Sequence, residues 1–193
     1  MAKAPARTRQ TLLLLQVVAL FATSGCVVSS SHPLVELADS EPIPEYLLGA
    51  WDFAEVAGLS SDNQAGGVTF DENADGSLRI VVTDESGSFT RSASLTTVGD
   101  HRILSLAPIE GEDAWGFSML SFNETSQELS FWLLRNADVV RDIRLGLVPG
   151  EVSEFDQEEL AHLNASAEQL RAYFAAHPDA FSDRIAVLKK RSS

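Results

Sequence analysis

Apolar residues alternate with polar ones in several short stretches of the chain. Two of these stretches place apolar residues at every second position: Leu78, Ile80 and Val82 in one, and Ile143, Leu145 and Leu147 in the other. Successive side chains of a strand point to opposite faces, so this period predicts strands with one buried face. We therefore expect a half-buried strand at each of the two stretches.

Four more apolar stretches lie between these two, separated by short polar segments rich in Gly, Asp, Asn and Glu. They cover residues 88–98, 102–107, 115–123 and 128–135. The connections are short enough for hairpins, and strands that follow one another usually pair. The pattern predicts a mainly β fold, an antiparallel meander that forms a small barrel or sandwich.

Beyond Pro149 the spacing becomes helical. Apolar residues within 155–163 predict a short acidic helix, and the acids from 151 to 159 form a solvated face or a site for a cation or partner. The capping-box sequence at 166–169 predicts a second helix, which Pro178 ends. A last apolar segment, Ile185 to Leu188, is expected to return to the sheet edge.

The first 26 residues have the layout of a secretory signal. Basic residues Lys3, Arg7 and Arg9 precede an apolar stretch from Leu12 to Ala22. As a helix this stretch would span roughly 16 Å, against about 30 Å for the hydrocarbon core of a membrane. It is too short for a membrane-spanning anchor.

Small residues Ser24 and Gly25 run directly into Cys26, the only cysteine of the chain. This resembles the lipobox of bacterial lipoproteins, although Thr23 stands where Leu is usual. The resemblance implies removal of residues 1–25, lipidation of Cys26 and attachment to a membrane of the cell envelope, the periplasmic face of the outer membrane in a Gram-negative source. A plain secretory signal followed by a free thiol is the alternative.

Composition sharpens this picture. Residues 26–44 are rich in Ser and Pro, so we expect the lipidated Cys26 to be followed by a flexible tether, and residues 45–193 to form one domain. Removing the signal changes the net charge from −14 to −17. That charge opposes binding to nucleic acid and to anionic lipid. The lone cysteine excludes an intramolecular disulfide.

Gly49 and Trp51 at the start of the first strand resemble the GxW motif of lipocalins. The resemblance implies a lipocalin-like barrel with Trp51 at its base and an apolar ligand at its other end. Trp115, Phe117 and Trp132 would line such a cavity together with Trp51, because ligand pockets are mostly apolar. A packed core is the alternative. Residues 166–181 are also similar to the tail of some uncharacterised proteobacterial lipoproteins.

Asp71, Asn73 and Asp75 match the first half of a calcium loop, with oxygen ligands at alternate positions. The bidentate Glu of such a loop is replaced by Val82, and the same residues suit a tight turn. The sequence thus favours a turn, with a weak calcium site as the alternative. It predicts no other metal site and no cofactor.

No catalytic motif is present, and the four histidines are scattered. A hydrolase would need a Ser or carboxylate to converge with His101 or His162 in a cleft. We therefore expect binding rather than catalysis. One hypothesis is an envelope lipoprotein that carries a small apolar ligand in its barrel. The other is an accessory protein that contacts another envelope protein and holds no internal ligand.

Overall fold

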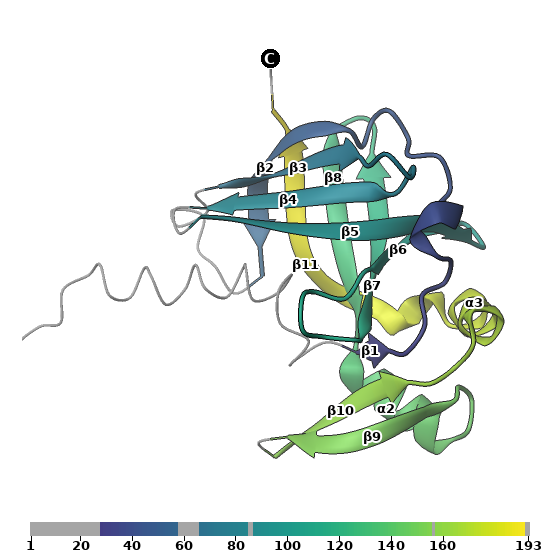
Figure 1. Cartoon of the computed structure of the whole chain (residues 1–193). Coiled ribbons are helices and arrows are strands. Elements are labelled where there is room, and N and C mark those ends of the chain that lie inside the picture. The colour runs from purple at the N-terminus through teal and green to yellow at the C-terminus, as the bar shows by residue number, and fades with distance from the viewer. Residues whose placement is uncertain (1–27, 58–65, 85–86, 156, 192–193) are drawn as a thin grey trace, which may run out of the picture.

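Eight antiparallel strands close into a barrel in the computed structural model, which describes residues 28–57, 66–84, 87–155 and 157–191 (Figure 1). The strands are β2 (Gly49–Val56), β3 (Gly67–Glu72), β4 (Leu78–Asp84), β5 (Gly87–Val98), β6 (His101–Leu106), β7 (Trp115–Asn123), β8 (Glu128–Leu134) and β11 (Phe181–Lys190). Consecutive strands from β2 to β8 pair as a meander, and β11 pairs with both β8 and β2. The predicted mainly β meander is confirmed, and it forms a barrel rather than a sandwich.

A long segment separates β8 from β11, and we call residues 136–180 the insertion. It contains α2 (Asn136–Arg144), β9 (Gly150–Phe155), β10 (Glu158–Leu163), α3 (Ala167–Ala176) and the short 3-10 helix η4 (Pro178–Ala180). Figure 1 shows the β9–β10 hairpin and α2 below the barrel, with α3 beside it. The short strand β1 (Ser29–Ser30) joins the two parts, because it pairs with β7 of the barrel and with β10.

Alternation along the strands produces two hydrophobic cores. On β8, Phe131 belongs to the core inside the barrel, while its neighbour Trp132 packs against a second core. This second core lies between the outer surface of the barrel and the insertion, with Phe117 of β7 and Phe174 of α3 in edge-to-face contact at 5.2 Å between ring centroids. The insertion is therefore packed onto the barrel rather than appended to it.

The strand predicted at residues 143–147 is wrong. Ile143 lies in α2, and the side chains of Leu145 and Leu147 are 66% and 52% exposed. Val139 and Val140 are buried and Ile143 is partly buried, a spacing that suits one face of a helix. Apolar residues two apart near a helix end imitate strand alternation, and Gly146 turns the chain there with φ +71°.

The helix predicted at residues 155–163 is also wrong, because Phe155 ends β9 and Glu158–Leu163 form β10, the two paired strands of a hairpin. The second predicted helix is confirmed as α3. The Ser166 hydroxyl accepts from the backbone N–H of Gln169, whose side chain accepts in return from the N–H of Ser166. The apolar segment 185–188 lies in β11, which closes the barrel instead of forming an edge.

The described part of the expected tether, residues 28–44, packs on the barrel. Val28 and Leu34 are fully buried. The backbone N–H of Leu34 donates to the Ser105 hydroxyl at 3.0 Å, and the Ser94 hydroxyl donates to the carbonyl of Val35 at 2.8 Å. These bonds between side chains and backbone hold a segment whose composition is typical of a linker, so this part of the chain is not a flexible tether.

Before β2, the segment contains the one-turn helix η2 (Leu37–Asp39). Just beyond it, the Ser40 hydroxyl accepts from the N–H of Leu95, and the Glu41 carboxylate accepts from both the N–H and the hydroxyl of Thr97. The segment therefore follows the outer side of β5 as a continuous strap.

Candidate functional site

Aromatic side chains fill the interior of the barrel. Trp51, Phe70 and Phe131 are almost fully buried, and the ring centroids of Phe70 are 6.5 Å from those of Trp51 and 6.0 Å from those of Phe131. The Trp51 indole N–H donates to the carbonyl of Leu47 at 2.9 Å, so this buried donor is satisfied. The pockets that described residues line open on the outside of the molecule.

Lys190 covers Trp51 at one end of the barrel. Its ammonium lies 4.9 Å from the centroid of the Trp51 ring and donates to the carbonyls of Tyr46 and Leu48 at 2.8 and 2.5 Å. Burial lowers the pKa of Lys190, because it penalises the charged form. The Trp51 that the lipocalin resemblance places at the base of the barrel is therefore closed off by a lysine.

The four residues predicted to line a cavity do not surround one space. Trp51 lies inside the barrel and Phe117 lies in the second core. Trp132 packs outside the barrel, with the Arg184 guanidinium 5.9 Å from its ring centroid, and Trp115 is half-buried where β7 pairs with Ser30. Strand alternation explains the separation. Phe131 of β8 faces the barrel interior, so its neighbour Trp132 must face outward, away from Trp51.

The calcium candidates form the turn of the β3–β4 hairpin, as the preferred interpretation predicts. Asp71 pairs with Arg79 at 2.7 Å, and the Asn73 amide donates to the Ser77 hydroxyl at 2.9 Å. Asp75 accepts from the hydroxyl and from the N–H of Ser77 at 2.6 and 3.0 Å. These two bonds, the hydroxyl first, lower the pKa of Asp75. Each side chain thus serves the hairpin itself.

The two histidines named for a possible hydrolase lie in different surroundings. His162 lies between two serines, with the Ser29 hydroxyl 2.8 Å from its Nδ1 and the Ser31 hydroxyl 2.8 Å from its Nε2. These bonds fix β1 against β10. His101 lines a separate open groove of about 740 Å³, which Asp100, Ser121 and Glu124 also line, and it forms no hydrogen bond to another described side chain.

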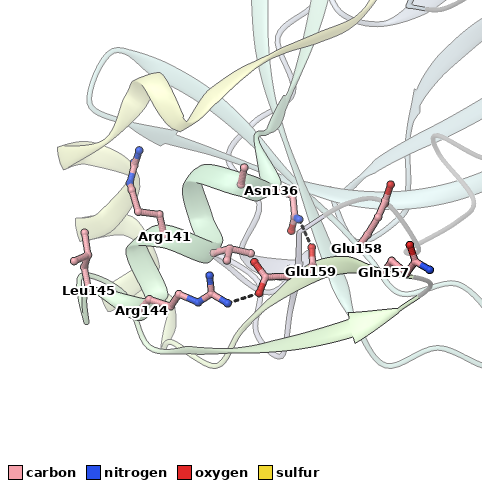
Figure 2. A pocket seen from close by; sticks show the side chains of 9 residues that line it. Asn136, Arg141, Arg144, Leu145, Gln157, Glu158 and Glu159 are labelled. Atoms are coloured by element: carbon pink, nitrogen blue, oxygen red, sulfur yellow. Dashed lines mark hydrogen bonds and ion pairs between the residues drawn. The ribbon is translucent and has the colours of Figure 1, made fainter.

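An open groove of about 580 Å³ runs between α2 and β10 (Figure 2). Ala137, Val140 and Leu145 of α2 and its end supply apolar lining, while Glu158 and Glu159 contribute from β10. Figure 2 shows the guanidinium of Arg144 reaching across to the carboxylate of Glu159, with which it forms an ion pair. We call this feature the α2–β10 groove.

Asn136 fixes one wall of the groove to the other. Its side-chain amide donates to the carbonyl of Glu159, and its side-chain oxygen accepts from the N–H of Ala161 at 3.0 Å. The side chain thereby occupies the hydrogen-bonding edge of β10 just before the point where β1 begins to pair with it. No element of the sequence pattern pointed to this role, because it depends on contacts between distant segments.

A buried carboxylate holds the two helices of the insertion together. Asp142 of α2 is 2% exposed and accepts from the Tyr173 hydroxyl of α3 at 2.8 Å and from Nε of Arg141 at 3.0 Å. Burial first, and then the bond to Asp142, raises the pKa of Tyr173. Asp142 therefore links α2 to α3, and removal of its partner would leave a buried carboxylate without that hydrogen bond.

The insertion exposes both apolar and acidic side chains. Among the described residues, the large hydrophobic side chains that stand exposed are Leu145, Leu147 and Phe155, and all three lie in the insertion. Glu151, Glu154, Glu158 and Glu159 lie on the adjoining hairpin. A single exposed apolar residue is ordinary, whereas several that form one patch with a polar rim mark a binding surface. The helical spacing of Val139, Val140 and Ile143 was the sequence signal for α2.

Comparison with other proteins adds no family assignment: no family model matches the chain, and no match was found among curated proteins or solved structures. In the part of the chain that the structure describes, no helix has the length and apolar character needed to cross a membrane. No group of His, Cys, Asp or Glu among those residues is arranged to hold a metal ion.

Proposed function

We propose that this protein is a lipid-anchored protein of the bacterial cell envelope that binds another envelope protein through its insertion. The observation that carries the proposal is the distribution of apolar side chains. The barrel buries its own, Trp51 and Phe70 among them, whereas the insertion exposes Leu145, Leu147 and Phe155. A filled interior favours an accessory protein over a carrier of an internal ligand.

Cys26 supplies the anchor in this proposal. It lies outside the described residues, so the support comes from the lipobox-like sequence that ends at this cysteine. Val28, two positions later, is fully buried beside β1. Two residues reach about 7 Å when extended, so lipid on Cys26 would hold the body of the protein close to the membrane. A partner that meets the insertion would then be bound near the membrane surface.

Replacement of Cys26 tests the anchor. We expect Cys26→Ala to remove incorporation of labelled palmitate and to release the protein from the membrane fraction, since the thiol is the acceptor of the lipid. Thr23→Leu is the matched control, because it restores the usual lipobox residue and should label at least as well as wild type. Unchanged labelling of Cys26→Ala would exclude lipidation at this residue.

Photo-crosslinking in cells tests the binding surface. A photoreactive residue replaces Phe155 in one variant, and Thr90, an exposed residue of β5, in the control. The proposal predicts one discrete adduct from position 155 and none of that size from position 90. The same adducts at both positions, or none at either, would overturn it. A small molecule retained by the barrel in native mass spectrometry would instead support ligand carriage.

A further inference from the structure

The strand β9 has one paired edge and one open edge. It is the terminal strand of the sheet, and among the described residues it pairs with β10 alone. Its side chains from Ser153 to Phe155 are exposed. An open edge presents unpaired N–H and C=O groups, which can accept a further strand.

The register of the hairpin identifies the backbone groups on the open edge. Ala161 and Leu163 of β10 turn their backbone groups away from β9, because Ala161 donates to Asn136 and the carbonyl of Leu163 accepts from Ser31. Their partners in the hairpin are Val152 and Gly150. In an antiparallel ladder every second pair is bonded, so the N–H and C=O groups of Val152 and Glu154 point outward from β9.

The side chains beside this edge carry negative charge and one aromatic ring. Glu154 has no ion-pair partner among the described residues, and Glu151 accepts only from the Asn164 amide, at 3.1 Å. Phe155 is 68% exposed. A second copy of this chain would bring the same acids together across the new pair of strands, and directly opposed like charges are destabilising. The edge therefore favours a basic partner over self-association.

We infer that β9 binds an extended, basic segment of the partner as an additional strand of the sheet. This inference rests on the proposed function, and it specifies how the partner is recognised. Glu151 and Glu154 are three positions apart and so lie on opposite faces of β9. Matching cations in the partner segment are therefore three residues apart, with an apolar residue next to one of them to contact Phe155.

A peptide with this pattern, Thr-Val-Lys-Thr-Val-Lys-Thr, is the probe for the test, added to the folded full chain. We expect saturable binding in NMR titration and slower hydrogen exchange at the amides of Val152 and Glu154, because these amides gain acceptors. A peptide with Glu in place of both Lys should not bind, and one with Pro at the second Val, whose N–H would bond to Val152, should bind more weakly. Equal binding of all three peptides would overturn the inference.

Two substitutions at one position separate strand addition from simple charge attraction. Glu154→Pro removes an outward N–H that β10 does not use, and proline is tolerated on the open side of an edge strand. Glu154→Ala removes the same carboxylate but keeps the N–H. Strand addition predicts that Glu154→Pro weakens the peptide about tenfold or more, since a hydrogen bond is lost. Loss of an exposed charge alone should weaken it by a factor of about two to five.

Equal effects of the two variants would overturn strand addition, provided that both keep the exchange protection of β10. Loss of that protection in Glu154→Pro would identify a damaged hairpin. In that case Glu151→Lys is the test: the inference predicts that the peptide no longer slows exchange at the amides of Val152 and Glu154, and unchanged slowing would overturn it. The result also separates this inference from the proposed function. A crosslink at position 155 without protection of these amides would support the proposed binding function and overturn strand addition at β9.

Discussion

The barrel and the insertion use their apolar residues in opposite ways. In the barrel, large side chains such as Phe70 and Phe131 are in contact with each other, and no large hydrophobic side chain is exposed among the described residues of the eight barrel strands. In the insertion, Val139 and Val140 are buried against the barrel, whereas Leu145 and Phe155 face solvent. This difference suits the proposed function, in which the barrel stabilises the fold and the insertion provides the surface that contacts the partner protein.

The two regions also differ in how they are held. Hairpins between neighbouring strands build most of the barrel, so its contacts are local in sequence. The insertion depends on single polar side chains: Asn136 binds the backbone of β10, and Asp142 binds Tyr173. Each such contact is a place where one substitution loosens the insertion without opening the barrel.

The largest expected effect comes from the barrel core. Phe131→Ala should lower the free energy of unfolding by about 3–5 kcal/mol, because it removes a buried ring and leaves a cavity. Phe155→Ala, the same change at an exposed position, should alter it by no more than about 0.5 kcal/mol. Urea denaturation measures both. A large loss in Phe155→Ala would show that the insertion is part of the stabilising core.

A medium effect is expected where α2 meets α3. Tyr173→Phe removes the hydroxyl that donates to the buried Asp142, so it should cost about 1–3 kcal/mol. Hydrogen exchange should speed up in α2 and stay unchanged in β3 to β5. The matched control is Tyr46→Phe, because Tyr46 accepts from Arg102 at a half-exposed site of the barrel and should matter less. Equal losses of unfolding free energy in the two variants would show that the Tyr173–Asp142 contact has no special role in holding the insertion together.

The smallest effect concerns acid. Hydrogen bonds from Ser77 lower the pKa of Asp75 in the folded protein. Its ionised form therefore stabilises the β3–β4 hairpin above the unfolded pKa of about 4, and this contribution is lost as the pH falls through the lower folded pKa. Thermal unfolding of Asp75→Asn should depend less on pH below 4 than that of wild type. The same slope in both proteins would exclude this carboxylate as a source of acid sensitivity.

Sequence reasoning located the barrel because one face of each strand is buried by the same interior. Leu78, Ile80 and Val82 repeat at two positions, and all three are in the barrel core. The capping box of α3 was equally readable, because both of its bonds lie within four residues. Patterns that a single local element creates are thus recoverable from the chain alone.

The helices and strands of the insertion could not be predicted in the same way, because contacts with residues distant in the sequence fix them. β10 bonds to β1, 133 positions away, and the acids that favour a helix there lie instead on an open hairpin. The strap at residues 28–44 was missed for the same reason. Its serines read as linker residues, whereas Ser40 serves the backbone of Leu95. The candidate surface therefore emerged only from the structure, apart from the acidic run at 151–159.

The position of β11 determines when the barrel becomes complete. Lys190 pairs with Trp51, which precedes it by 139 positions, and the whole insertion lies between. Pairing of strands so far apart in the sequence is slow, so one edge of β2 and one edge of β8 stay unpaired until β11 joins them. The last strand described therefore closes the barrel across a stretch of chain that contains the whole insertion.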